Sequence, residues 1–107
     1  MKQNRIEQLE KYLSEDPNDA FSKYALAMEL KDEDEERTIQ LYDDLLSNHP
    51  EYGGTYYHAA NFFSELGDRD KAEFIYIKGL EVLEIQQDYH GLRELKNAYQ
   101  NFQFEDL

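Results

Sequence analysis

Cysteine is absent from this sequence of 107 residues, and so is tryptophan. Without cysteine the chain has no disulfide, no thiol nucleophile and no thiolate ligand for a metal, and its composition fits a reducing compartment. A chain of this length buries about two-thirds of the surface that it exposes when unfolded, so it needs no cross-link. We therefore expect one domain that is held together by its apolar core.

Long apolar runs are also missing. Residues 1–13 contain no continuous apolar segment and no small-residue cleavage site, so they lack the pattern of a signal peptide. No stretch approaches the roughly 20 apolar residues that a membrane span requires. We expect a soluble, cytoplasmic protein with no membrane partner.

Basic residues are scarce, since 11 Lys and Arg face 24 Asp and Glu and the formal net charge is −13. This charge repels nucleic-acid phosphates and anionic lipid headgroups, so we predict no nucleic-acid partner. Two explanations of the acidity stay open. It keeps a small helical protein soluble, or it attracts a basic partner.

Patterns typical of enzymes are missing as well. The three histidines, His49, His58 and His90, do not have the spacing of metal ligands. No glycine-rich phosphate loop and no nucleophile elbow occurs. The acidic run at residues 32–36 lacks the glycine of a calcium loop and is typical of a solvated loop that leads into a helix. We predict no catalytic residue, no metal and no cofactor.

Apolar residues with helical spacing run through most of the chain. The pattern is clearest in a hairpin at residues 56–83, where Tyr56, Ala60 and Phe63 mark the first helix and Gly67 suits a left-handed turn. The second helix of this hairpin extends to about residue 87. Further helices are predicted at residues 5–13, 20–31, 35–47 and 92–102, with Asn18 or Asp19 as the N-cap of the second and a frayed tail at 103–107.

The chain also repeats itself. Residues of the same type recur 33 positions apart, as in the pairs Tyr24 and Tyr57, Ala27 and Ala60, and Pro17 and Pro50. In the second helices the offset is 34, as in Tyr42 and Tyr76, because the first interhelical turn is one residue shorter. The period indicates two equivalent helical hairpins.

A helix-turn-helix unit of about 34 residues, with small residues at the helix crossings and aromatic residues between layers, resembles the tetratricopeptide repeat. The positions that carry the resemblance are Tyr56, Ala60, Phe63, Ala72, Tyr76 and Gly79. The sequence departs from the family pattern at Lys23, where tryptophan is usual, at Thr38, where alanine is usual, and at Glu84, where proline is common.

The resemblance implies an all-α fold, a right-handed α-α superhelix of about five antiparallel helices, in a single tetratricopeptide-like domain over residues 1–107. It divides the chain into a half repeat at 1–17, full repeats at 20–52 and 53–88, and a half repeat at 89–102.

The resemblance further implies a concave groove, lined by the first helices of the repeats, that holds a peptide or a partner helix. The groove residues carried over in this way are Phe21, Tyr24, Met28, Tyr57, His58, Asn61, Arg93 and Asn97. The clamp of lysine, asparagine and arginine with which one subtype binds a C-terminal carboxylate is absent.

The expected function is a non-catalytic protein-interaction scaffold. A homodimer formed through exposed terminal helices is the alternative. A fragment of a longer array is a third possibility, against which the starting methionine and the polar end of the chain count.

Overall fold

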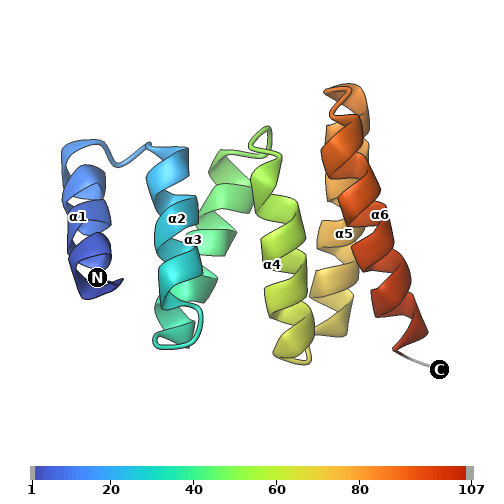
Figure 1. Cartoon of the computed structure of the whole chain (residues 1–107), viewed down its shortest axis with the longest axis horizontal. Coiled ribbons are helices and arrows are strands. Elements are labelled where there is room, and N and C mark those ends of the chain that lie inside the picture. Colours follow the sequence, from blue (N-terminus) through green and yellow to red (C-terminus); the bar gives the residue numbers. More distant parts are fainter. Residues whose placement is uncertain (1, 106–107) are drawn as a thin grey trace. The chain divides into compact units, whose positions relative to one another are not determined.

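The computed structural model describes residues 2–105 and folds them into six helices, with no strand among them (Figure 1). The helices are α1 (Lys2–Glu15), α2 (Ala20–Leu30), α3 (Glu35–Asn48), α4 (Gly54–Glu65), α5 (Arg69–Ile85) and α6 (Tyr89–Phe104). The all-α class is confirmed. The described residues form six helices where about five were expected. Each periodic segment of the sequence forms a helix.

The helices belong to two compact units, Met1–Tyr52 and Gly53–Leu107, called unit 1 and unit 2 below. In unit 1, α2 packs against both α1 and α3. In unit 2, α5 packs against both α4 and α6, and α4 also contacts α6. Within the described residues, none of the helices is both long enough and apolar enough to span a membrane.

Four aspartates begin helices. The side chains of Asp19, Asp34, Asp68 and Asp88 each accept a hydrogen bond from the backbone N–H three residues later. These caps satisfy N–H groups that a helix leaves unpaired, and their charge suits the positive end of the helix dipole. Asp19 rather than Asn18 is therefore the N-cap of α2. Asp88 is the N-cap of α6, which begins at Tyr89, three residues before its predicted start at residue 92.

Two helices end in a left-handed residue. Gly67, after α4, has φ +87° as predicted, and Gln87, after α5, has φ +59°. In both turns the following amide, of Asp68 or Asp88, donates to the carbonyl five residues earlier at 3.0 Å. A residue other than glycine costs roughly 1–2 kcal/mol in this conformation, so the second turn is the more strained of the two.

The last helix is longer than expected. It continues to Phe104, two residues beyond its predicted end, so residues 103 and 104 are helical rather than frayed. Residues 106 and 107, which also belong to the expected tail, lie outside the described residues.

In unit 2, α5 approaches both of its neighbours closely at Gly79. A Cβ atom at this position would lie 2.5 Å from Cβ of Tyr56 and 2.7 Å from Cδ2 of Leu95. Tyr56 on α4 and Leu95 on α6 are 1% and 0% exposed. Only glycine lets α5 approach both neighbours this closely, which agrees with the small crossing residue expected here.

The core of unit 1 contains two of the departures from the family pattern. Leu26, Tyr42 and Leu45 are almost completely buried, and Lys23 and Thr38 are buried among them. Thr38 donates its hydroxyl hydrogen to the backbone carbonyl of Asp34 at 2.8 Å. A polar side chain is tolerated there because its hydrogen bond is satisfied.

Candidate functional site

A surface pocket lies between α4 and α6 in unit 2. Its volume is about 230 Å³, and its lining residues are Tyr57, Asn61, Ser64, Glu65, Tyr76, Ala98, Asn101, Phe102 and Glu105. The helices α4 and α6 run in the same direction (Figure 1), and the pocket extends along α4 from Tyr57 to Glu65 and along the C-terminal half of α6. The predicted site residues Tyr57 and Asn61 therefore meet α6 in one place.

Tyr76 of α5 lies at the inner wall of this pocket. Its side chain is 2% exposed, and its ring centroid lies 5.1 Å from that of Phe102 and 5.4 Å from that of Tyr99. The Tyr76 hydroxyl donates a hydrogen bond to Oδ1 of Asn61. This bond fixes the orientation of the Asn61 amide at the pocket wall.

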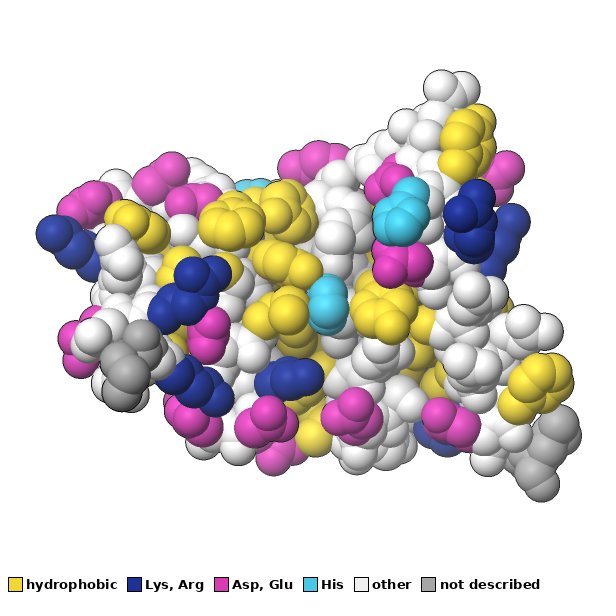
Figure 2. Space-filling view, in the orientation of Figure 1, with side chains coloured by type: hydrophobic (Ala, Val, Ile, Leu, Met, Phe, Trp, Pro, Cys, Tyr) yellow, Lys and Arg dark blue, Asp and Glu magenta, His cyan; other side chains and the backbone are white. Residues whose placement is uncertain are grey.

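The pocket is negatively charged. Glu65, at the end of α4, and Glu105, after α6, line it, and Figure 2 shows acidic side chains along the lower edge of unit 2. Arg69 lies 3.5 Å from Glu105 and stacks over the ring of Phe102. Burial, followed by the charge of Glu105, raises the pKa of Tyr76 to about 12, while Arg69 opposes this effect.

Replacing Tyr76 with phenylalanine should remove part of the alkaline sensitivity of the fold. The unfolded side chain ionises near pH 10.0, whereas the folded one stays protonated to about pH 12. Its stabilisation is therefore complete below pH 10 and lost between pH 10 and 12, which amounts to roughly 2–3 kcal/mol. In urea titrations at pH 9, 10 and 11.5, the free energy of unfolding should fall less for Tyr76→Phe than for the parent.

The same substitution should cost about 1 kcal/mol at pH 7, because the hydrogen bond to Asn61 is lost. Tyr89→Phe is the matched control, since it removes the hydroxyl of a tyrosine that is 62% exposed and outside the pocket. Parallel pH profiles for the parent and Tyr76→Phe would contradict the assignment.

The other predicted site residues of unit 2 lie beside the pocket. His58 is half-buried and packs edge-on against Tyr57, with ring centroids 5.2 Å apart. Arg93 and Asn97 are exposed on α6 and are not among the lining residues. They stay predictions for the binding surface, without a place in this pocket.

The predicted site residues do not include those that α6 and its C-cap contribute to the pocket, namely Ala98, Asn101, Phe102 and Glu105. A signal for them exists, because positions 98, 101, 102 and 105 have the i, i+3, i+4 and i+7 spacing of one helix face. Phe102, the aromatic member of that set, is only 4% exposed and belongs to the core as well.

The predicted site residues of unit 1 lie on α2. Phe21 is 55% exposed, while Tyr24 and Met28 are half-buried. The ring of Tyr24 lies 5.7 Å from that of Tyr52, and burial, with a smaller effect of Tyr52, raises the pKa of Tyr24. Phe21 is therefore the member of this set that offers most side-chain area to a partner.

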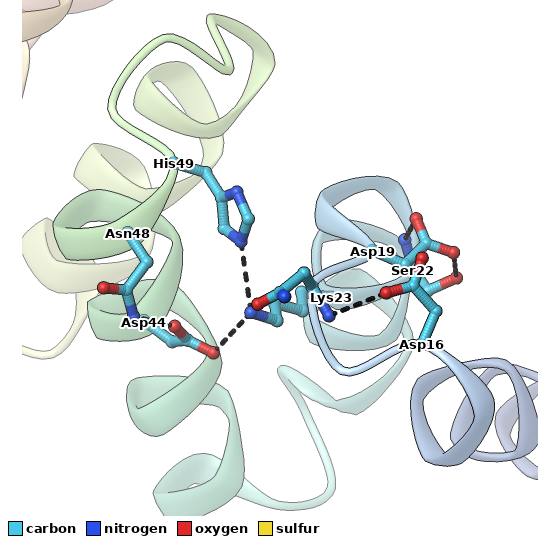
Figure 3. A network of polar contacts seen from close by, with 8 residues as sticks. Asp16, Asp19, Ser22, Lys23, Asp44, Asn48 and His49 are labelled. Carbon is cyan, nitrogen blue, oxygen red and sulfur yellow. Dashed lines mark hydrogen bonds and ion pairs between the residues drawn. The ribbon is translucent and has the colours of Figure 1, made fainter.

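A partly buried ion pair joins α2 and α3 in unit 1 (Figure 3). The Lys23 side chain is 7% exposed, and its Nζ lies 2.9 Å from Oδ2 of Asp44 and 3.1 Å from Nε2 of His49. Burial raises the pKa of Asp44, but hydrogen bonds from Lys23 and Asn48 outweigh it and hold the pKa below its usual value. The network explains how lysine occupies a position where the family usually has tryptophan.

A second pocket, of about 280 Å³, adjoins this network and includes Lys23, Arg37 and Asp44 in its lining. The positive charge of Lys23 in this pocket is already balanced by its ion pair with Asp44. Among residues 2–105, no group of three or more histidine, aspartate or glutamate side chains is arranged to hold a metal ion.

Comparison with known proteins finds relatives among solved structures. No protein-family model and no curated protein matches the chain. The crystal structure of a tetratricopeptide repeat domain protein from Salinibacter ruber is 34% identical, with a TM-score of 0.74, over 80% of this chain and 97% of the relative. A solution NMR structure of a tetratricopeptide repeat domain protein from the same organism is 35% identical, with a TM-score of 0.75, over 81% of this chain and 89% of the relative.

Proposed function

The chain belongs to the tetratricopeptide repeat family, and from this premise we propose that it is a non-catalytic scaffold that binds a peptide or a helix of another protein. A helical repeat fold of this kind typically mediates protein interactions. It offers several parallel helix faces to one partner, so that modest contacts on each face add up. The proposal includes no cofactor and no nucleic-acid partner.

The pocket between α4 and α6 is the observation that carries the proposal. It is concave, and it combines the exposed ring of Tyr57 with the amides of Asn61 and Asn101. Aromatic rings give contact area at low entropic cost, and amides can bond to a peptide backbone. This combination suits an extended peptide better than a small metabolite.

Each unit has its own proposed binding residues. In unit 1 they are Phe21, Tyr24 and Met28 on α2, and in unit 2 they are Tyr57, His58 and Asn61 on α4, with Arg93 and Asn97 on α6. Tyr57 is the best single residue for a test, because it is 39% exposed and lines the pocket. Asn61 is a poor choice, since its loss would also leave the buried Tyr76 hydroxyl without its acceptor.

We expect Tyr57→Ala to weaken binding of peptides selected on this protein about tenfold, as for a moderate interface hot spot. A phage-displayed library of random dodecapeptides supplies the peptides, and fluorescence anisotropy measures their affinity. Tyr89→Ala, which removes another exposed tyrosine outside the pocket, should bind as the parent does. A library without binders, or binders indifferent to Tyr57, would rule the proposal out.

Self-association through the terminal helices is the second candidate function. Tyr12 on α1 is 43% exposed, and Tyr89 and Phe104 on α6 are 62% and 57% exposed. Burying these rings against a second copy would remove apolar area from water. Size-exclusion chromatography with light scattering over a dilution series tests this, because a monomeric mass at every concentration would exclude it.

A further inference from the structure

We propose that the pocket between α4 and α6 receives a cationic side chain, of arginine or lysine, from an extended segment of the partner peptide. The inference rests on the proposed function and adds the chemistry of the ligand. Three features carry it: two helix ends, two carboxylates, and the way in which the chain's own Arg69 is bound next to the pocket.

Two helix C-termini meet at this pocket. Ser64 and Glu65 belong to the last turn of α4, and Asn101 belongs to the last turn of α6. The aligned peptide dipoles give each helix end roughly half a negative elementary charge. Neither helix has a basic residue in its last turn. A cation from the ligand would therefore take the place of the lysine, arginine or histidine that many helices carry in their last turn.

Two side chains add charge of the same sign. Glu65 ends α4 and Glu105 is the C-cap of α6, where a carboxylate opposes the helix dipole instead of complementing it. Glu105 is paired with Arg69 at 3.5 Å, whereas Glu65 takes part in none of the ion pairs found among residues 2–105. The arrangement is unfavourable in the free protein and becomes favourable when a cation binds.

Arg69 shows how a guanidinium is held at such a helix end. Its Cζ lies 4.0 Å from the ring centroid of Phe102, its Nη2 donates to the carbonyl of Phe102 at 2.9 Å, and its Nη1 pairs with Glu105. An aromatic face, a helix-end carbonyl and a carboxylate are together a strong set of partners for arginine. Arg69 provides this cation for the end of α6.

The α4 side of the pocket offers partners of the same kinds and, in the described part of the chain, has no cation of its own. Tyr57, in the first turn of α4, supplies an aromatic ring, and Ser64 and Glu65, in its last turn, supply a hydroxyl and a carboxylate. No lysine, arginine or histidine is among the described lining residues. A cationic side chain of a bound peptide would neutralise the end of α4, as Arg69 neutralises the end of α6.

The size of the pocket favours one side chain over a small-molecule ligand. Its volume of about 230 Å³ lies below the range of roughly 300–1,000 Å³ that is usual for sites of drug-sized ligands. The amide oxygen of Asn101 can accept from a guanidinium or an ammonium group. An acidic side chain would instead meet two carboxylates and two helix C-termini.

The first test uses N-acetyl-arginine amide as the cation and N-acetyl-citrulline amide as its neutral analogue of the same shape. In the labelled protein, the side-chain amide signals of Asn61 and Asn101 should shift with millimolar arginine derivative and not with the citrulline derivative. The shifts should shrink as sodium chloride screens the charge. Equal shifts from both compounds, or shifts confined to the acidic segment at residues 32–36, would overturn the inference.

The second test compares peptides selected from the dodecapeptide library on two variants. Glu65→Gln removes the pocket charge, and Glu81→Gln makes the same change at an exposed position of α5 outside the pocket. The selected peptides should carry arginine or lysine, bind Glu65→Gln about threefold more weakly, as for a partly exposed ion pair, and bind Glu81→Gln unchanged.

These outcomes separate the two proposals. Neutral or acidic peptides that depend on Tyr57 but not on Glu65 would overturn the cation inference and leave the proposed function intact. A lack of any Tyr57-dependent binder would overturn both.

Discussion

Gly79→Leu is expected to destabilise the protein by about 3 kcal/mol, which is at the upper end for an overpacked core. Even a single Cβ would lie 2.5 Å from Cβ of Tyr56 and 2.7 Å from Cδ2 of Leu95, and Tyr56 cannot move without moving the backbone of α4. Gly79→Ala should still cost about 1–2 kcal/mol, although alanine gains about 1 kcal/mol in helix propensity. Urea unfolding followed by circular dichroism measures both values.

The control for this prediction is Gly91→Ala on α6. There the atoms nearest to a new Cβ belong to the Asp88 carboxylate, which can move, the closest at 2.7 Å. We expect the free energy of unfolding to change by less than about 1 kcal/mol, within the usual strength of the cap that Asp88 forms. If Gly79→Ala were as stable as Gly91→Ala, the close approach of α5 to its neighbours would be wrong.

Asp44→Ala is expected to cost about 2–3 kcal/mol. The Lys23 side chain is 7% exposed, so removing Asp44 leaves a buried ammonium whose remaining side-chain contact is Nε2 of His49. Breaking a fully buried pair costs about 3–5 kcal/mol, and the value is lower here because the Asp44 side chain is 35% exposed. Chemical denaturation at pH 7 measures the loss.

Lys23→Met should be nearly neutral in the same assay. It removes the buried charge and leaves an apolar chain of similar length, while Asp44 keeps its hydrogen bond from Asn48 and part of its hydration. In the double variant the cost of Asp44→Ala should largely disappear. Additive effects of the two substitutions would show that Lys23 and Asp44 do not act as a pair.

The helices could be predicted from sequence because their signals are local. The spacing of Tyr56, Ala60 and Phe63 indicates α4, and Gly67 adopts the left-handed turn expected of it. The start of α6 was misplaced because Asp88 caps it, and an aspartate is equally typical of a turn. The caps at Asp68 and Asp88 show that an aspartate followed by a periodic segment should be taken as a helix start.

The site was harder to predict because it depends on which turns of two helices face each other. Tyr57 and Asn61 line a pocket next to α6, and the facing residues include Asn101 and Glu105, which the sequence pattern does not single out. The axial position of α6 against α4 follows from packing around Gly79 and Leu95, which no local pattern encodes. The burial of Lys23 was missed for a similar reason, since its partners Asp44 and His49 come from another part of the chain.

The carboxylates at the ends of α4 and α6 lower the stability of these helices and form part of the proposed binding site. Selection for a robust fold alone would replace Glu65 by lysine, which suits a helix C-terminus, and would leave the N-terminal aspartate caps untouched. Such a change would also remove the carboxylate from the proposed site for a cationic side chain. Stabilising this protein by consensus or charge optimisation would therefore weaken the proposed binding, and Glu65 is the position to leave unchanged.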